Sequence, residues 1–486
     1  MSSRERPQGT IPAVSLLNTI NPARELTRRV FLFGLPLILG LAAHAIFNIV
    51  DTFLVGQLPG AEGAAGIAVT GLCDPVTTFQ TILFNGPIAG AGVLIAMRFG
   101  ARDEEGMRRM ALQATGFVLL LSVALGLPGA IFARELALMM GAREDAHQLE
   151  HCTQYLRVLL GGGFTGGMFL YLATLQRAVG SVKAFMALFL TSNVLNLLFC
   201  VMLIYGPGPY PEFIPAWWGD FASALQLPRL GVVGSAWGAV AARVVSVALA
   251  IILARGYLRG PISWLWPRGR ALWDLCSIGF WKNGQVAVRG IAGGVLIRVL
   301  QGAGGGDESV VSGVFVGMKI ELLLTLIAFG WGTASQTLVA TSIGAGKPTR
   351  GRAEERACMA LSLACSVAAT AVLLIFARDL AAWFNPEPEL VHWSERFLVI
   401  TAASFVLTPL NVVISQTMFS RMHLRLPVLI DGGVLLLVMV PTLIVCAIFG
   451  VPVEVLLWIN TACNVALTGV YVIVRWNMRR EAAVIP

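Results

Sequence analysis

The stretch LAAHAIFNIVDTFLVG, residues 41–56, predicts both a membrane-spanning fold and a candidate site. It belongs to an apolar segment long enough to cross a bilayer, and it contains the acid Asp51. A charged side chain at the centre of such a helix costs about 2.5–3.5 kcal/mol or more, so it generally has a use. His44, Asn48 and Asp51 share one helix face by their spacing. We expect this polar stripe either to hold a neighbouring helix by hydrogen bonds or to form a proton or cation site that faces a water-filled cavity.

The composition is that of a polytopic membrane protein. The 486 residues are 56% hydrophobic and only 13% charged, whereas soluble domains carry about 25% charged residues. The mean hydropathy is +0.76. No cleavable signal-peptide pattern is visible near the N-terminus. The eight cysteines form no CxxC or Cys/His pattern that suits zinc, so we interpret them as reduced, buried residues and expect no metal and no cofactor.

Twelve segments are long enough to span a bilayer, because about 20 apolar residues of α-helix cover a hydrocarbon core of about 30 Å. They lie near residues 30–57, 63–97, 107–132, 147–176, 184–206, 231–257, 275–302, 309–343, 353–376, 391–419, 425–449 and 453–476. The predicted fold class is all-α, with twelve transmembrane helices.

The loops between these segments alternate in charge, and this alternation predicts the topology. Arg and Lys concentrate in the N-terminal residues 4–29 and in the segments 98–109, 177–183, 255–270, 347–356, 421–425 and 475–480. The opposite loops are acidic or neutral. By the positive-inside rule we expect both termini in the cytoplasm, as in a protein of a bacterial-type inner membrane. The same asymmetry accounts for the net charge of +8 without a nucleic-acid partner.

The chain also contains an internal repeat. GARDEEGMRRM from Gly100 aligns with GAGKPTRGRAE from Gly344, and FARELALMM from Phe132 aligns with FARDLAAWF from Phe376, both at an offset of 244 residues. Six spans in each half give the two halves the same orientation, an arrangement found in secondary transporters. We predict a cytoplasmic N-terminus (1–29), an N-lobe (30–257), a cytoplasmic linker (258–274), a C-lobe (275–476) and a cytoplasmic C-terminus (477–486).

Over nearly its whole length the chain resembles the multidrug and toxic compound extrusion (MATE) family. FNIVDTFLVGQL (47–58) matches the first-helix pattern of that family, and RFGARDEEGMRRM (98–110) and SIGAGKPTRGRAE (342–354) resemble its loops after helices two and eight. SNVLNLLFCVMLIYG (192–206) resembles its fifth helix, and GVVGSAWGAVAARVVS (231–246) its small-residue sixth helix. The resemblance implies a V-shaped bundle of two six-helix lobes that exports cationic and amphipathic drugs, coupled to inward flow of H⁺ or Na⁺.

The resemblance also implies site residues. Asp51 takes the position of the N-lobe acid, and Asn196 that of the fifth-helix asparagine, while Cys200 replaces the fifth-helix aspartate. A hard cation such as Na⁺ needs several oxygen ligands, so we expect proton coupling, as in the DinF-like branch, with Na⁺ as the alternative. Asp51, Asn48, His44, Asn196 and Cys200 are the predicted coupling and substrate residues. His44 either relays the proton or packs as a neutral imidazole.

In this scheme protonation of Asp51 weakens the binding of a cationic substrate and favours the inward-facing state, and deprotonation towards the cytoplasm restores binding. Asp74 is a second candidate acid, and the following Pro75 suggests a helix break there. We see no catalytic constellation, so we expect a transporter and not an enzyme. Its expected partners are small molecules and membrane lipids, and we expect a monomer.

The C-terminal half carries basic residues inside apolar segments, namely Arg289, Arg298 and Lys319. We expect Glu321 to be the only acid near the centre of this half, and its spacing from Lys319 disfavours a direct pair. These basic residues suit an alternative function, a flippase that binds the pyrophosphate of an anionic lipid-linked precursor.

Overall fold

The structure is a computed structural model that describes residues 22–143, 146–212, 214–215, 217–303, 308–384 and 387–484, and the regular structure within these residues is helical. The first half comprises α1 (Pro22–Gly56), α2 (Ala61–Gly100), α3 (Glu104–Ile131), α4 (Ala133–Met139), α5 (Ala146–Gly161), α6 (Gly163–Ala178), α7 (Val182–Tyr205), α8 (Trp217–Ala224) and α9 (Val232–Ala254). A 3₁₀ turn, η1 (Ile262–Leu265), leads to the second half. This comprises α10 (Arg270–Ala303), α11 (Glu308–Gly344), α12 (Pro348–Ile375), α13 (Ala377–Phe384), α14 (Pro388–Ser420), α15 (Arg425–Asp431), the π-helix η2 (Gly432–Met439), α16 (Val440–Ile448) and α17 (Val453–Val484).

Eleven of the described helices are long and apolar enough to cross a membrane. A twelfth span results if His147–Gly161 and Gly163–Ala178, which meet at an angle of 41°, count as one bent helix. The prediction of an all-α protein with twelve spans is therefore confirmed, and the chain is an integral membrane protein. The helix break expected at Pro75 is wrong, because α2 runs through both Pro75 and Pro87, as proline-containing membrane helices can when neighbouring groups satisfy the backbone.

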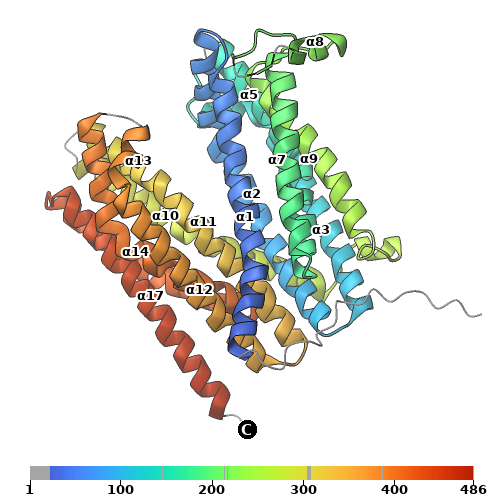
Figure 1. Cartoon of the computed structure of the whole chain (residues 1–486), viewed down its shortest axis with the longest axis vertical. Coiled ribbons are helices and arrows are strands. Elements are labelled where there is room, and N and C mark those ends of the chain that lie inside the picture. Colours follow the sequence, from blue (N-terminus) through green and yellow to red (C-terminus); the bar gives the residue numbers. More distant parts are fainter. Residues whose placement is uncertain are drawn as a thin grey trace, which may run out of the picture.

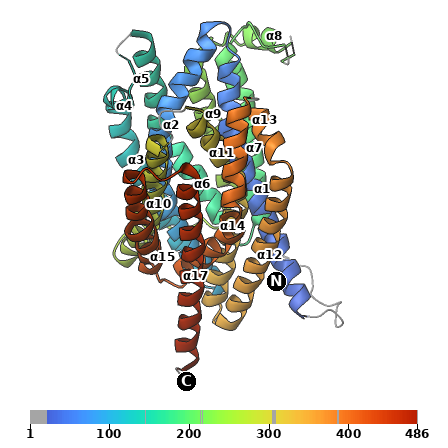
Figure 2. The same cartoon turned by 90° about the vertical axis from the view of Figure 1, so that its left-hand side faces the viewer.

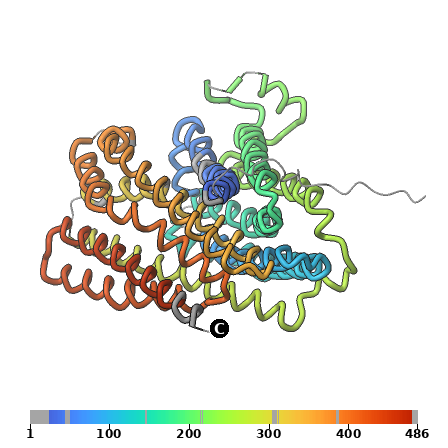
Figure 3. Tube along the Cα trace, turned by 60° about the horizontal axis from the view of Figure 1, so that its bottom comes forward, coloured from blue at the N-terminus to red at the C-terminus, as the bar shows by residue number. Residues whose placement is uncertain are grey.

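The helices form two bundles, α1–α9 and α10–α17, which we call the N-lobe and the C-lobe (Figure 1). The two lobes lie together at one end of the molecule and diverge towards the other, so that the chain outlines a V (Figure 1). The view in Figure 3, in which that end is turned forward, shows the lobes side by side. The bounds of the predicted domains stay a prediction.

The end at which the lobes meet is the basic end of the molecule. The described part of α1 begins there and α17 ends there (Figure 2). The loops that follow α2, α6 and α11 lie at the same end, and basic residues stand in or next to each of them. In the loop after α2, the Asp103 side chain caps α3 by accepting a hydrogen bond from the Gly106 amide at 2.9 Å. In the repeat-related loop after α11, Pro348 occupies the first turn of α12.

Glycines bring the two lobes into backbone contact at the basic end. A Cβ atom added to Gly100, the last residue of α2, would lie well under 3.0 Å from the Thr341 carbonyl oxygen of α11. A Cβ on Gly344, the last residue of α11, would lie equally close to the Met97 carbonyl of α2. Gly100 and Gly344 are the two residues that the repeat aligns. Each copy of the repeated loop therefore begins at a glycine that touches the backbone of the other lobe.

A second pair of glycines repeats this pattern deeper in the bundle. Gly86 of α2 faces the Gly279 carbonyl of α10 at 2.5 Å from an added Cβ, and Gly330 of α11 faces Ile38 of α1 within the same range. Gly86 and Gly330 are again 244 residues apart. Small residues allow membrane helices to approach closely, so α2 and α11 form a symmetric seam between the lobes.

Candidate functional site

The N-lobe brings three of the predicted residues into direct contact. Asp51 lies on α1, and Asn196 and Cys200 lie one turn apart on α7. The Asn196 amide donates to Asp51 Oδ1 at 2.5 Å, and the Cys200 thiol donates to the same oxygen at 3.3 Å. Cys200 Sγ also lies 3.4 Å from Asn196 Oδ1. Asn196 and Cys200 are buried and Asp51 is half-buried, so the carboxylate is held inside the bundle by two neutral donors.

Hydrogen bonds on either side of Asp51 fix α1 against α7. Towards the basic end, the Asn193 amide donates to the Ala43 carbonyl at 2.5 Å. Towards the other end, the Tyr205 hydroxyl donates to the Leu54 carbonyl at 2.7 Å. Each bond is worth about 0.5–1.5 kcal/mol net, and together they define which face of α1 meets α7. The position of the Asp51 side chain is therefore set by contacts above and below it.

Close packing of α9 supports the other side of this site. A Cβ atom on Gly238 would lie 2.7 Å from Cys200 Sγ, so only glycine allows α9 to approach α7 here. Cys200 Sγ lies 3.6 Å from the Ser235 carbonyl one turn earlier on α9. Tyr155 of α5 lies near the Ser235 side chain. Helix α9 thus packs against α7 beside the site, and α5 packs against α9 in turn.

Arg243 of α9 adds a positive charge to the site, close enough to interact with Asp51 electrostatically. Tyr155 lies in the same electrostatic neighbourhood. Sequence reasoning missed both residues. An arginine in the middle of the apolar run VAARVVSVAL was a visible signal for Arg243, whereas nothing in the sequence sets Tyr155 apart from an interfacial tyrosine. Within the described part of the chain, no three His, Cys, Asp or Glu side chains gather as a metal site.

The remaining N-lobe candidates are His44, Asn48 and Asp74. The side chains of His44 and Asn48 lie outside the described residues. Asp74 is exposed on α2, and its recorded contact is a hydrogen bond from the Thr77 hydroxyl to its backbone carbonyl at 3.0 Å. The structure therefore describes Asp51, Asn196 and Cys200 as one unit and Asp74 as separate from it.

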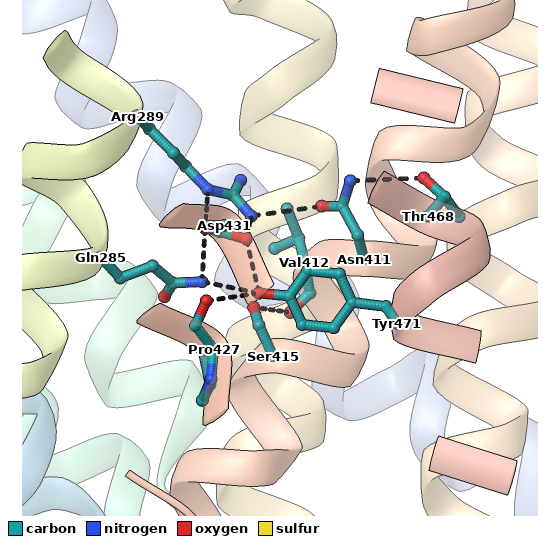
Figure 4. Close-up of polar contacts among 9 residues, drawn as sticks. All are labelled: Gln285, Arg289, Asn411, Val412, Ser415, Pro427, Asp431, Thr468 and Tyr471. Atoms are coloured by element: carbon teal, nitrogen blue, oxygen red, sulfur yellow. Dashed lines mark hydrogen bonds and ion pairs between the residues drawn. The ribbon is translucent and has the colours of Figure 1, made fainter. Parts of the chain in front are cut away.

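The C-lobe contains a buried carboxylate that the sequence analysis overlooked. Asp431 is 0% exposed and accepts a hydrogen bond from Arg289 Nε at 2.6 Å, as Figure 4 shows. Gln285 donates to the same carboxylate at 3.0 Å, and the Tyr471 hydroxyl donates at 2.7 Å. The expectation that Glu321 is the only central acid of this half is therefore wrong.

Asp431 lies only six residues after the basic loop 421–425, close to the predicted start of a span. It was therefore not recognised as an acid inside the membrane. In the structure α15 passes without a break into the π-helix η2 and then into α16, so Asp431 lies within one long span. The wider turn of a π-helix often accompanies a functional site. Arg289 Nη2 further reaches Asn411 Oδ1 at 3.5 Å, and Asn411 donates to the Thr468 hydroxyl at 3.4 Å. This network joins α10, α14, α15 and α17 (Figure 4).

The other C-lobe candidates stay apart. Arg298 and Lys319 are exposed on different helices, and Lys319 Nζ lies over the Phe315 ring at 5.4 Å from its centroid. Glu321 is half-buried. No ion pair between Lys319 and Glu321 is recorded among the described residues, in agreement with their spacing. Arg289, Arg298 and Lys319 therefore do not converge on one basic site.

Comparison with known proteins gives consistent results. The family profile of MatE matches residues 36–202 and 302–445. The chain is 23% identical over 457 residues to the probable multidrug resistance protein YoeA of Bacillus subtilis, covering 92% of this chain and 89% of that protein. It is 23% identical over 391 residues to a FAD transporter of Shewanella oneidensis, covering 78% and 79% of the two chains. Among solved structures, an outward-facing multidrug resistance MATE family transporter of the MOP superfamily superimposes with a TM-score of 0.81 at 20% identity, over 97% of this chain and 100% of that one. With its family profile matched in both lobes, the chain belongs to the MatE family of membrane transporters.

Proposed function

We propose that this chain is a secondary transporter that exports amphipathic organic compounds, organic cations among them, in exchange for protons that bind at Asp51. The observation that carries the proposal is the Asp51 carboxylate, held inside a membrane bundle by the Asn196 amide and the Cys200 thiol. An intramembrane acid with neutral donors is suited to gain and lose a proton, because neither donor has to be ionised or displaced. Relatives named for drug resistance and for FAD transport support an amphipathic organic substrate.

The surroundings of Asp51 favour H⁺ over Na⁺. A sodium ion needs several oxygen ligands, and a thiol stands beside the carboxylate where a further oxygen would be needed. A proton requires no such ligand set, since it forms a covalent bond to the carboxylate oxygen.

Helix α1 can carry the effect of protonation from Asp51 to the lobe boundary. It packs on α7 of the N-lobe and also on α11 and α12 of the C-lobe. A proton on Asp51 turns the charge-assisted hydrogen bond from Asn196, which is worth about 1.5–3 kcal/mol, into a weaker neutral one. The contact between α1 and α7 then weakens, and α1 becomes free to shift with the C-lobe. In this scheme protonation also releases a cationic substrate by removing its counter-charge.

We further propose that the basic end faces the cytoplasm of a bacterial-type inner membrane, in agreement with the positive-inside rule. Both termini are then cytoplasmic, and the lobes diverge towards the outside. The chain acts as a monomer, because both lobes come from one polypeptide. The flippase alternative loses support in the form predicted from the sequence, since Arg289 is paired with Asp431 and stands apart from the exposed Arg298 and Lys319.

The test is transport by purified protein in proteoliposomes under an imposed pH gradient, with ethidium as the fluorescent cation. Wild-type protein should move ethidium against its gradient with or without sodium, and Asp51→Asn should lose this activity. Asp74→Asn is the matched control, because it makes the same chemical change at an exposed position on α2. Normal transport by Asp51→Asn, or a strict requirement for sodium, would disprove proton coupling at Asp51.

A further inference from the structure

We propose that the boundary between the lobes holds the anionic group, phosphate or carboxylate, of an amphiphile, bound by Lys282 and Arg177. We call these two residues the boundary cations. The proposal deepens the proposed function, on which it rests, by assigning a negative group to the transported compound. Lys282 lies on α10 of the C-lobe and Arg177 in the last turn of α6 of the N-lobe, so such a ligand would be held from both sides.

Lys282 has neutral partners only. Its ammonium donates a hydrogen bond to Gln416 Oε1 and lies over the Phe419 ring, 4.5 Å from the centroid. Its charged neighbours are Arg177, Arg289 and Asp431. The one acid in that group, Asp431, already forms an ion pair with Arg289 at 2.6 Å. The positive charge of Lys282 is therefore not compensated by a carboxylate of its own.

Arg177 is even more enclosed. The sequence placed it in a basic loop, where it would be solvated, but the structure places it inside the bundle with 5% exposure. Its Nη1 donates to the Thr333 carbonyl of α11 at 3.4 Å, and its Nε is buried without a hydrogen-bond acceptor. The adjacent Gln176 amide is likewise buried without an acceptor. A buried donor left unpaired costs about 1–3 kcal/mol of free energy, and more when it is charged. A ligand that supplies an acceptor to Arg177 Nε would therefore be stabilised there.

Contacts connect the two boundary cations across the seam. Thr333, which accepts from Arg177, lies one turn before Gln336 on α11, and the Gln336 carbonyl accepts from the Ser420 hydroxyl of α14 at 2.8 Å. Ser420 is one turn from Gln416, the partner of Lys282. The buried Gln336 amide nitrogen is a further donor without an acceptor. Arg177 Nε, Gln176 Nε2 and Gln336 Nε2 are thus three buried donors that lack an acceptor, while Asn283 Oδ1, next to Lys282, is a buried acceptor that lacks a donor.

The C-lobe network provides a comparison, because it contains a membrane-embedded arginine whose charge is paired. Arg289 pairs with Asp431 and also donates to Asn411 Oδ1, while Gln285 and Tyr471 donate to the same carboxylate (Figure 4). Among the described residues, Arg177 and Lys282 form no ion pair with a carboxylate, although two like charges close together repel each other. Charged side chains inside a membrane that lack a partner of opposite charge generally mark ligand or ion sites. A phosphate or carboxylate provides two or more oxygens for a guanidinium and an ammonium, and the Phe419 ring beside Lys282 suits the apolar part of the same compound.

The boundary site differs from the basic residues of the flippase hypothesis. Arg298 and Lys319 are exposed, whereas Lys282 and Arg177 lie where α6, α10, α11 and α14 meet. Lys319 provides a control inside the same protein. It is also an intramembrane lysine over a phenylalanine ring, but its side chain is exposed.

The experiment measures the acylation of lysines in wild-type protein in a neutral detergent, read by mass spectrometry for Lys282 and Lys319 separately. The anionic probe is dodecyl phosphate, and the matched cationic amphiphile is dodecyltrimethylammonium. With dodecyl phosphate at ten times its dissociation constant, acylation of Lys282 should fall about tenfold by mass action. Acylation of Lys319 should stay unchanged, and dodecyltrimethylammonium should protect neither lysine. No mutation is needed, so loss of folding cannot explain the result.

A second arm identifies the source of the anion. The same labelling in nanodiscs of phosphatidylcholine, with and without phosphatidylglycerol, shows whether a lipid headgroup alone protects Lys282. Protection by phosphatidylglycerol assigns the site to lipid, and protection by dodecyl phosphate only assigns it to a free amphiphile. Labelling of Asp51→Asn separates this proposal from proton coupling, since protection of Lys282 should persist in that variant. Equal protection of both lysines, equal protection by the cationic amphiphile, or no protection of Lys282 would overturn the anion site.

Discussion

Replacing Gly100 or Gly344 by alanine should separate the lobes at the basic end. At either position the added methyl group would lie well under 3.0 Å from a backbone carbonyl of the other lobe, that of Thr341 or of Met97. A backbone carbonyl cannot rotate away as a flexible side chain can. The helices α2 and α11 therefore have to move apart for either variant to be accommodated.

The size of the effect follows from the cost of overpacking, about 1–3 kcal/mol for an extra carbon in a well-packed contact. If the cost falls only on the conformation in which this end is closed, the equilibrium shifts away from that conformation by about five- to 150-fold. Each substitution adds a methyl group to the same contact between α2 and α11, one from each helix. Because the two glycines are related by the internal repeat, the two effects should be similar in size.

Hydrogen–deuterium exchange gives a readout on the opposite lobe. The Thr341 carbonyl also accepts a hydrogen bond from the Ala345 amide at 3.0 Å, and the Met97 carbonyl accepts one from the Ala101 amide at 3.0 Å. Gly100→Ala should therefore speed exchange at Ala345, and Gly344→Ala should speed exchange at Ala101. Exchange in the middle of either lobe should be unaffected.

The control is Gly294→Ala on α10, where an added Cβ meets nothing within 4 Å. Alanine favours a helix over glycine by about 0.5–1 kcal/mol, so this variant should be as stable as the wild type or slightly more so. Unchanged exchange at Ala345 in Gly100→Ala, or an equal effect of Gly294→Ala, would refute the assignment of the seam as a closed contact.

Three further outcomes are expected. Asp431→Asn should lower the free energy of unfolding by about 3–5 kcal/mol, because it leaves the Arg289 charge buried and unpaired. The double variant Arg289→Met, Asp431→Leu removes both charges and should restore most of the thermal midpoint. An equal loss of stability in the single and the double variant would argue against the ion pair. Asn196→Ala should impair proton-coupled efflux more than Cys200→Ala does, since an amide donor to a carboxylate is stronger than a thiol donor, and the reverse order in a transport assay would contradict the geometry at Asp51. Glu355→Gln should lower the free energy of unfolding by several kcal/mol, because Arg421 and Arg475, each 2.5 Å from the Glu355 carboxylate, lose their shared partner. A thermal midpoint equal to that of the wild type would contradict this expectation.

The features that the sequence predicted are those encoded over short distances or by repetition. Span number depends on the length of apolar segments, and the seam glycines Gly100 and Gly344 stand out because two copies of one loop align. The contact between Asp51 and Asn196 was accessible through the resemblance of two separate helices to known patterns. Each of these signals can be read without knowing how the helices pack.

The features that escaped prediction depend on packing between distant segments. Arg289 and Asp431 are 142 residues apart, and nothing in either segment indicates the other. Arg177 follows an apolar run and precedes a turn, so it looked like one of the loop residues that set the topology. Arg177 is buried because its side chain extends to α11, where it donates to the Thr333 carbonyl. The sequence alone does not show this contact. The sequence analysis did not single out Lys282, although it is a lysine within an apolar segment, and its surroundings are a property of the fold alone.

The central claim is that Asp51 binds the proton that drives export. It is tested most directly by proton movement that a substrate gradient drives in proteoliposomes without an imposed pH gradient, recorded with a pH-sensitive dye inside the vesicles. Wild-type protein and Asp74→Asn should move protons opposite to the ethidium flux, and Asp51→Asn should move none. Proton counter-flow that persists in Asp51→Asn, or ethidium flux in the wild type without any proton movement, would contradict the account.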